Sequence, residues 1–181
     1  FTAYGNFKTA IGNIKSDISL KKDTKRNTYS YQGKLTADEF NIGKFLDSQD
    51  YLGKVSLNAN IDGSGFEKSN INTKLKGIIN SIDLYGYTYK NITIEGLFAN
   101  KIFDGKLNIE EENINLTFAG NVNLVDKMPV FDFSANVKKA NLSNLHILKD
   151  RDSVIVSSDM KFNFTGDDID NGIGNIILSN T

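Results

Sequence analysis

Few side chains in this sequence have the types and spacing that catalysis or metal binding requires. The chain has one histidine, His146, and no cysteine, so it offers neither a catalytic triad nor a Cys-type zinc site. Neighbouring carboxylates occur at 110–112 (EEE) and 166–170 (GDDID). The second group could supply oxygens to a cation, but its spacing does not fit the twelve-residue calcium loop and also suits a solvated turn. We expect no enzyme activity, no metal site and no cofactor.

Two other short motifs are weaker still. The stretch DGSG at 62–65 lacks the lysine and the helix of a phosphate-binding loop, so it predicts a tight turn. The tripeptide DSV at 152–154 is similar to the O-glycosylation acceptor of Bacteroidetes periplasmic proteins, and whether it is used stays open. The 21 basic and 22 acidic residues are mixed along the chain, which argues against nucleic acid as a partner.

The clear pattern in the sequence is apolar and has a period of two. Within 87–109, Tyr87 and Tyr89, followed by Ile92 and Ile94, would lie on one face of a sheet, with polar residues on the other. The same alternation and the turn residues between the runs predict eleven strands, at 3–9, 12–22, 28–38, 52–63, 70–83, 86–97, 102–110, 113–124, 130–140, 153–165 and 173–179. The pair DG at 104–105 predicts a bulge or a hairpin turn.

Only two segments have apolar residues spaced three or four apart. These are 38–46 (DEFNIGKFL) and 139–148 (KANLSNLHIL), which predict one or two short helical turns. Both segments are too short to cover one face of a sheet of about ten strands. We therefore expect an apolar face without a protein lid.

The chain also repeats itself faintly, with an offset near one hundred residues. YSYQGKL (29–35) matches FDFSANV (131–137) in the parity of its apolar residues, and the order of elements is the same in 29–66 and 131–169. Repeated strand units that cannot cover their own apolar face predict an elongated, stacked architecture. Because both ends of the chain lie inside strand-like patterns, we expect residues 1–181 to be one fragment of a longer repetitive domain.

The apolar face has two interpretations. It could be half of an ordinary closed β-sandwich core, or the inside of a long curled sheet that forms an open hydrophobic groove. In the second case it would hold lipid acyl chains, because each methylene removed from water contributes about 0.8 kcal/mol. The predicted groove-lining residues are Tyr29, Tyr31, Leu35, Leu57, Ile61, Leu75, Ile94, Phe103, Leu107, Leu116, Phe118, Val122, Phe131, Phe133, Phe162 and Phe164.

The central strands share a longer motif, Y-x-Y-x-N-I-x-[IL]-x-G, then F-x-G-x-L, then N-x-x-L-x-F-x-G-x-V-x-L. The matching residues are Tyr87, Tyr89, Asn91, Ile92, Ile94, Gly96, Phe103, Gly105, Leu107, Leu116, Phe118, Gly120, Val122 and Leu124. This motif resembles the repeats of the TamB family, the inner-membrane-anchored subunit of the translocation and assembly module, and more specifically a Bacteroidetes-type member. The resemblance covers essentially the whole chain, and 29–124 is its most specific part.

The resemblance implies an AsmA-like β-taco fold, also described as a repeating β-groove. It implies a periplasmic bridge in a Gram-negative bacterium that conducts phospholipid between the inner and outer membranes, assists outer-membrane protein assembly, or does both. The implied partners are phospholipid acyl chains, further repeats of the same full-length protein, and an outer-membrane barrel similar to TamA that would contact segments outside this fragment. The alternative that we retain is a closed β-sandwich binding or adhesion module without lipid transport.

Overall fold

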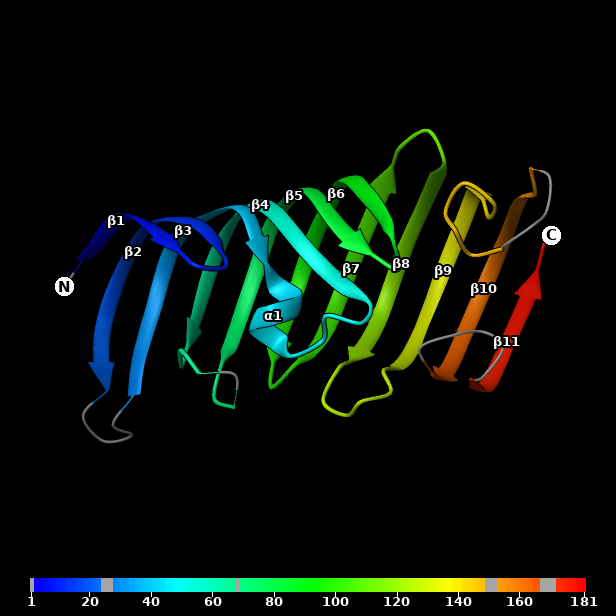
Figure 1. The fold of residues 1–181 in the computed structure, drawn as a ribbon. Coiled ribbons are helices and arrows are strands. Elements are labelled where there is room, and N and C mark those ends of the chain that lie inside the picture. Colours follow the sequence, from blue (N-terminus) through cyan, green and yellow to red (C-terminus); the bar gives the residue numbers. More distant parts are fainter. Residues whose placement is uncertain (1, 24–27, 68, 149–152, 167–171) are drawn as a thin grey trace.

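The computed structural model describes residues 2–23, 28–67, 69–148, 153–166 and 172–181. These residues form one antiparallel sheet in which each strand pairs with the next along the chain, and the sheet does not close on itself. The eleven strands are β1 (Thr2–Thr9), β2 (Gly12–Asp23), β3 (Thr28–Asn41), β4 (Leu52–Ser64), β5 (Asn72–Leu84), β6 (Tyr87–Ala99), β7 (Ile102–Glu110), β8 (Ile114–Asn123), β9 (Val130–Asn141), β10 (Ile155–Thr165) and β11 (Ile173–Ser179). The predicted all-β, open and curled sheet is confirmed (Figure 1).

The two segments with helical spacing behave differently. The first contains α1 (Ile42–Leu46), a single short helix between β3 and β4. Its N-cap is Asn41, whose Oδ1 accepts a hydrogen bond of 2.8 Å from Lys44 N. The second segment forms hydrogen-bonded turns over 142–148 and no helix. Both connections leave the sheet at the same end of the strands, in the two parts of the predicted repeat.

Two of the predicted turn positions are wrong. Asp104 and Gly105 lie inside β7 in regular register with β6 and β8, and the hairpin turn falls at Asn100 and Lys101, which both have positive φ. Similarly, the first three residues of 62–65 belong to β4, and the chain turns only after them. In β7 the alternation of apolar residues continues through the DG pair. In both cases the ladder of paired strands outweighs the local turn preference.

Irregular pairing is concentrated toward the end of the strands that carries α1. Two residues of β3 lie opposite one residue of β4 where the register shifts between Ala37 and Phe40, and Glu39 there has φ 51°. Further shifts occur within 52–57 of β4, at 115–116 of β8 and at 156–158 of β10. Such bulges bend a strand and increase its twist. They account for the strands that curl over at the top of Figure 1, with α1 in front of the central strands.

Candidate functional site: an apolar inner face

The cross-strand register places all sixteen predicted groove residues on one side of the sheet, which we call the inner face. Leu107, for example, pairs with Ile94 on β6 and with Phe118 on β8, and residues paired in an antiparallel ladder point to the same side. One cross-strand row runs over ten strands and contains only apolar residues and glycine: Ile18, Gly33, Ile61, Leu75, Gly96, Gly105, Gly120, Phe133, Phe162 and Ile176.

The inner face is neither sealed nor fully open. Of the sixteen residues, Tyr31, Phe118 and Phe164 are buried, Tyr29 is exposed, and the other twelve are half-buried. A sandwich core would bury such a row completely against a second layer. Among the described residues there is no second sheet, so much of this apolar surface keeps contact with solvent.

Aromatic side chains gather on the inner face at β8, β9 and β10. The rings of Phe133 and Phe162 are stacked, with centroids 4.8 Å apart and an interplanar angle of 14°. Phe118 lies 4.6 Å from Phe133, and Phe164 lies 5.4 Å from Phe162. Stacked and tilted pairs of this kind add about 0.5–1.5 kcal/mol beyond the area they bury. The aromatic cluster is thus a rigid apolar platform toward one end of the sheet.

Next to this platform, the inner face is lined by glycine. Gly96, Gly105 and Gly120 are direct neighbours across β6, β7 and β8. A methyl group on Gly96 would lie 2.7 Å from Phe103 Cε2 and 2.9 Å from Gly105 Cα, closer than van der Waals contact allows. The missing side chains therefore let the Phe103 ring lie against the backbone of β6 and β7.

A strap consisting of α1 and residues 47–51 crosses the middle of the inner face. Leu46 is 2% exposed and forms a buried cluster with Tyr51 and Leu52. Phe98 and Leu124 pack against this cluster from the opposite end of the strands, so the strap spans the face from one rim to the other. The expectation that no segment covers the apolar face is therefore wrong for its middle.

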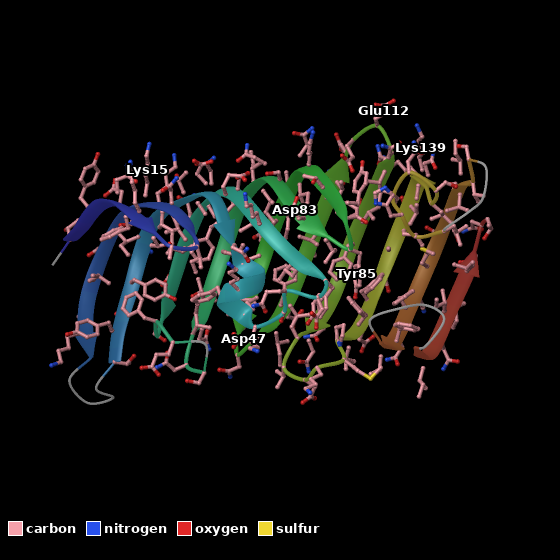
Figure 2. The ribbon with its side chains drawn as sticks, viewed as in Figure 1. Lys15, Asp47, Asp83, Tyr85, Glu112 and Lys139 are labelled. Atoms are coloured by element: carbon pink, nitrogen blue, oxygen red, sulfur yellow. The ribbon has the colours of Figure 1, made fainter. Side chains whose placement is uncertain are left out.

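The strap is attached differently at its two sides. At its own rim, Tyr51 O accepts a hydrogen bond of 2.9 Å from Tyr85 N, and the two rings are stacked 5.8 Å apart. Figure 2 shows Tyr85 and Asp47 in front of the sheet beside α1. At the far rim, the contacts in the Leu46 cluster come from the apolar side chains of Phe98 and Leu124.

The turns at 142–148 form a second bridge along the rim. Leu145 is 1% exposed and belongs to the same buried cluster as Ile92 and Ile109 of the inner face. His146 Nδ1 lies 3.1 Å from the carbonyl oxygen of Gly86, in the turn between β5 and β6; because a carbonyl only accepts, Nδ1 carries the proton. The sole histidine thus connects two turns that are distant in the chain.

Half-buried tyrosine and glutamate side chains lie beside this bridge. Burial raises the pKa of Tyr89 to about 12, and it also raises the pKa of Tyr87. Glu111 Oε1 is buried without a hydrogen-bond partner, and burial raises the pKa of its carboxyl group. Tyrosine hydroxyls are neutral at physiological pH in any case, and the raised pKa values keep these two neutral to a higher pH.

Three buried residues of the inner face are absent from the predicted groove-lining set. Ile79, Ile92 and Val137 are buried in the main cluster but were not predicted to line the groove. In β5 the apolar residues change from odd to even numbers after Ile79, and in β6 they change after Tyr89. Such a change of parity within one strand is the sequence signal of a bulge. Val137 needs no such signal, because it keeps the odd parity of Phe131 and Phe133.

The feature that the described residues offer to a ligand is the apolar inner face. They contain no group of three or more His, Cys, Asp or Glu side chains placed to hold a metal ion. Residues 167–170 of the candidate cation turn, and Asp152 of the glycosylation-like tripeptide, lie outside the described part of the chain. None of the helices described is long and apolar enough to cross a membrane.

Comparisons of the chain with family models, with curated proteins and with solved structures found no match.

The glycine row yields a stability prediction. We expect Gly96→Ala to lower the free energy of unfolding by about 1–3 kcal/mol, because the new methyl group must displace Phe103 and the β7 backbone. Urea denaturation followed by circular dichroism measures the change. Gly5→Ala is the matched control, since its methyl group would meet the movable Phe7 ring, and we expect a change within about 0.5 kcal/mol. Equal effects of the two substitutions would contradict the close packing at Gly96.

The burial of Tyr89 yields a pH prediction. The pKa of Tyr89 is near 10 in the unfolded chain and about 12 in the folded one. Between these two pH values the folded chain keeps a proton that the unfolded chain has lost. Its contribution to stability is fully present below pH 10 and is lost as the pH rises toward 12. We expect Tyr89→Phe to remove part of the decline in the urea midpoint over this interval. An unchanged pH profile in the variant would show that Tyr89 is accessible to water.

Proposed function

We propose that this chain is a hydrophobic groove that holds the acyl chains of phospholipids. The observation that carries the proposal is the continuous inner face, which is apolar over ten strands and half-buried at most positions. A soluble protein rarely exposes an apolar surface of this extent unless a ligand or a neighbour covers it. An acyl chain fits such a face because it needs no directional polar contact.

The energetics favour an acyl chain that is retained on the inner face but can slide along it, rather than one bound at a single position. Each methylene group that leaves water contributes about 0.8 kcal/mol, so several methylene groups suffice to retain a lipid chain. The row through Leu75, Gly96 and Phe133 contains no charged side chain that would fix a headgroup at one position. Similar apolar contacts recur from strand to strand, so a chain can move along the face without leaving a deep site.

The strap divides this surface into parts of different accessibility. Lipid would contact the inner face first on either side of α1, because Leu46 and its neighbours are buried against Phe98 and Leu124. Passage along the whole face would exchange the contacts of Leu46 at the far rim for contacts with lipid. The hydrogen bond between Tyr51 and Tyr85 would keep the strap attached at its own rim during this exchange.

The resemblance to the TamB family supports a place for this groove in the cell. On this proposal the chain is part of an inner-membrane-anchored periplasmic protein of a Gram-negative bacterium. Its groove would carry phospholipid between the two membranes or shield apolar strands during outer-membrane protein assembly. Further repeats would extend the groove, and a barrel similar to TamA would bind through other segments.

Two other functions lead to different expectations. A closed-sandwich adhesion module needs a second layer over the inner face, and the described residues form a single sheet. A passive spacer between membrane complexes needs only a folded chain and would tolerate a charge on the inner face. The groove therefore differs from the spacer in its dependence on apolar side chains such as Leu107.

A charge placed on either face of the sheet tests the proposal. We expect Leu107→Glu to lower the binding of a fluorescent fatty acid and of phospholipid from liposomes at least about tenfold, since a buried carboxylate opposes an acyl chain. Ala119→Glu is the matched control: it adds the same charge to the neighbouring strand, but on the polar face opposite Lys106. We expect binding by this control to be unchanged.

Leu75→Glu provides a second charged variant of the inner face, away from the aromatic platform. Circular dichroism establishes that each variant remains folded before binding is measured. Equal lipid binding by the folded inner-face variants and by the Ala119→Glu control would refute the groove and favour the spacer.

A further inference from the structure

The outer face of the sheet, which lies opposite the inner face, carries a row of short polar side chains. Each strand from β7 to β11 contributes one aspartate or asparagine, and each of these residues pairs directly with the next: Asp104, Asn121, Asp132, Asn163 and Asn175. We call them the Asp/Asn row. Aspartate and asparagine are among the residues that strands disfavour. The pairing of the strands therefore does not explain why five of them lie side by side.

The side chains of the Asp/Asn row are not engaged with other residues. None of them has a hydrogen-bond or ion-pair partner within the described part of the chain. A second polar row, nearer the rim that carries α1, crosses the same strands and differs in this respect. There Thr117 Oγ1 donates a hydrogen bond of 3.2 Å to Asn108 Oδ1, and Asn136 Nδ2 donates one of 2.6 Å to Asp159 Oδ1. The donors and acceptors of the Asp/Asn row thus remain available to a ligand.

An open hollow of about 550 Å³ follows the Asp/Asn row, and all five of its residues line it. The other side of the hollow is lined by a parallel row of the outer face: Ala119, Ser134, Lys161 and Ile177. Between the two rows lie Gly120, Phe133 and Phe162. Because the phenylalanine side chains point to the inner face, the main chain forms the floor. The hollow is therefore a polar trough that crosses five strands.

We propose that this trough binds a linear, uncharged saccharide chain laid across the strands. Carboxylates accept hydrogen bonds, and amides both donate and accept them, so these side chains can bind the neighbouring hydroxyl groups of a sugar ring. Adjacent strands are about 4.8 Å apart, so the row presents one such group at roughly the length of one sugar ring in an extended chain. The site lies on the face opposite the apolar groove and does not depend on the proposed function.

The lining of the trough fits other ligands less well. It contains two acidic residues and one basic residue, Lys161, which opposes a polyanion such as nucleic acid. A peptide that adds to a sheet needs a free edge, whereas the strands that carry Asp104 to Asn163 are paired on both sides. A calcium ion needs oxygen ligands about 2.3–2.6 Å from one point, and the carboxylates of Asp104 and Asp132 stand on strands separated by β8.

Calorimetric titration with cellohexaose, a neutral linear hexasaccharide, tests the proposal. We expect the double variant Asn121→Ala/Asp132→Ala to weaken binding at least about tenfold, because hydrogen bonds to an amide and to a carboxylate are lost. The double variant Thr117→Ala/Asn136→Ala is the matched control. It removes a pair of polar side chains from the same two strands and the same face, but these side chains are already bonded to neighbours. We expect its binding to be unchanged.

Two further measurements separate a binding site from a structural role. Cellobiose spans fewer strands than cellohexaose and loses the corresponding hydrogen bonds, so we expect it to bind at least about tenfold more weakly. We also expect the urea midpoint of Asn121→Ala/Asp132→Ala to stay at or above that of the natural chain, because strands disfavour alanine less than asparagine and aspartate.

Several outcomes would overturn the proposal. These are no binding of cellohexaose at millimolar concentrations, equal loss of binding in the two double variants, or a lower urea midpoint in Asn121→Ala/Asp132→Ala. Titration with calcium chloride and with hexaglycine covers the other ligand classes. Saturable calcium binding that Asn121→Ala/Asp132→Ala abolishes would replace the saccharide site by a cation site, and tighter binding of hexaglycine than of cellohexaose would replace it by a peptide site.

Discussion

The register between neighbouring strands is the constraint on which this structure depends. A shift of one residue at any ladder would turn the apolar side chains of one strand to the polar face. Leu107 meets Ile94 and Phe118 because both ladders of β7 are regular throughout. From β2 to β11, the pairing likewise places apolar residues of neighbouring strands on the same side of the sheet. The many half-buried side chains therefore form one continuous surface.

Bulges give this surface its shape without breaking its continuity. A bulge adds a residue to one strand, so the residues beyond it change their numbering parity while they keep their side of the sheet. Phe40 thus follows Ala37 on the inner face, and Ile82 follows Ile79. Because several neighbouring strands carry irregular pairing near the same end, the strands bend together, and α1 comes to lie over the inner face. The bending of the strands and the covering of the inner face by α1 therefore have the same cause, the irregular pairing.

The cover itself is partial, and this matters for what the surface can do. The strap and the turns at 142–148 bury Leu46 and Leu145 almost completely, which anchors the middle of the sheet. Away from them, residues such as Leu75 and Phe131 remain half-buried, and β11 is exposed. The protein is thus held together where the two short segments cross its apolar face, and it keeps accessible apolar surface elsewhere.

The sequence alone determined the strands and the chemistry of their two faces. A period of two is a local property, so the alternation by itself assigns residues such as Tyr31, Leu107 and Phe162 to one apolar face. The same pattern does not show where the pairing shifts, so it did not continue the apolar face from Ile79 to Ile82, and it misplaced the turn near residue 104. Only the tertiary structure decided how far the sheet curls and what covers it. The contact of Leu46 with Phe98 and Leu124 joins segments far apart in the chain, and such contacts depend on the bend of every strand between them.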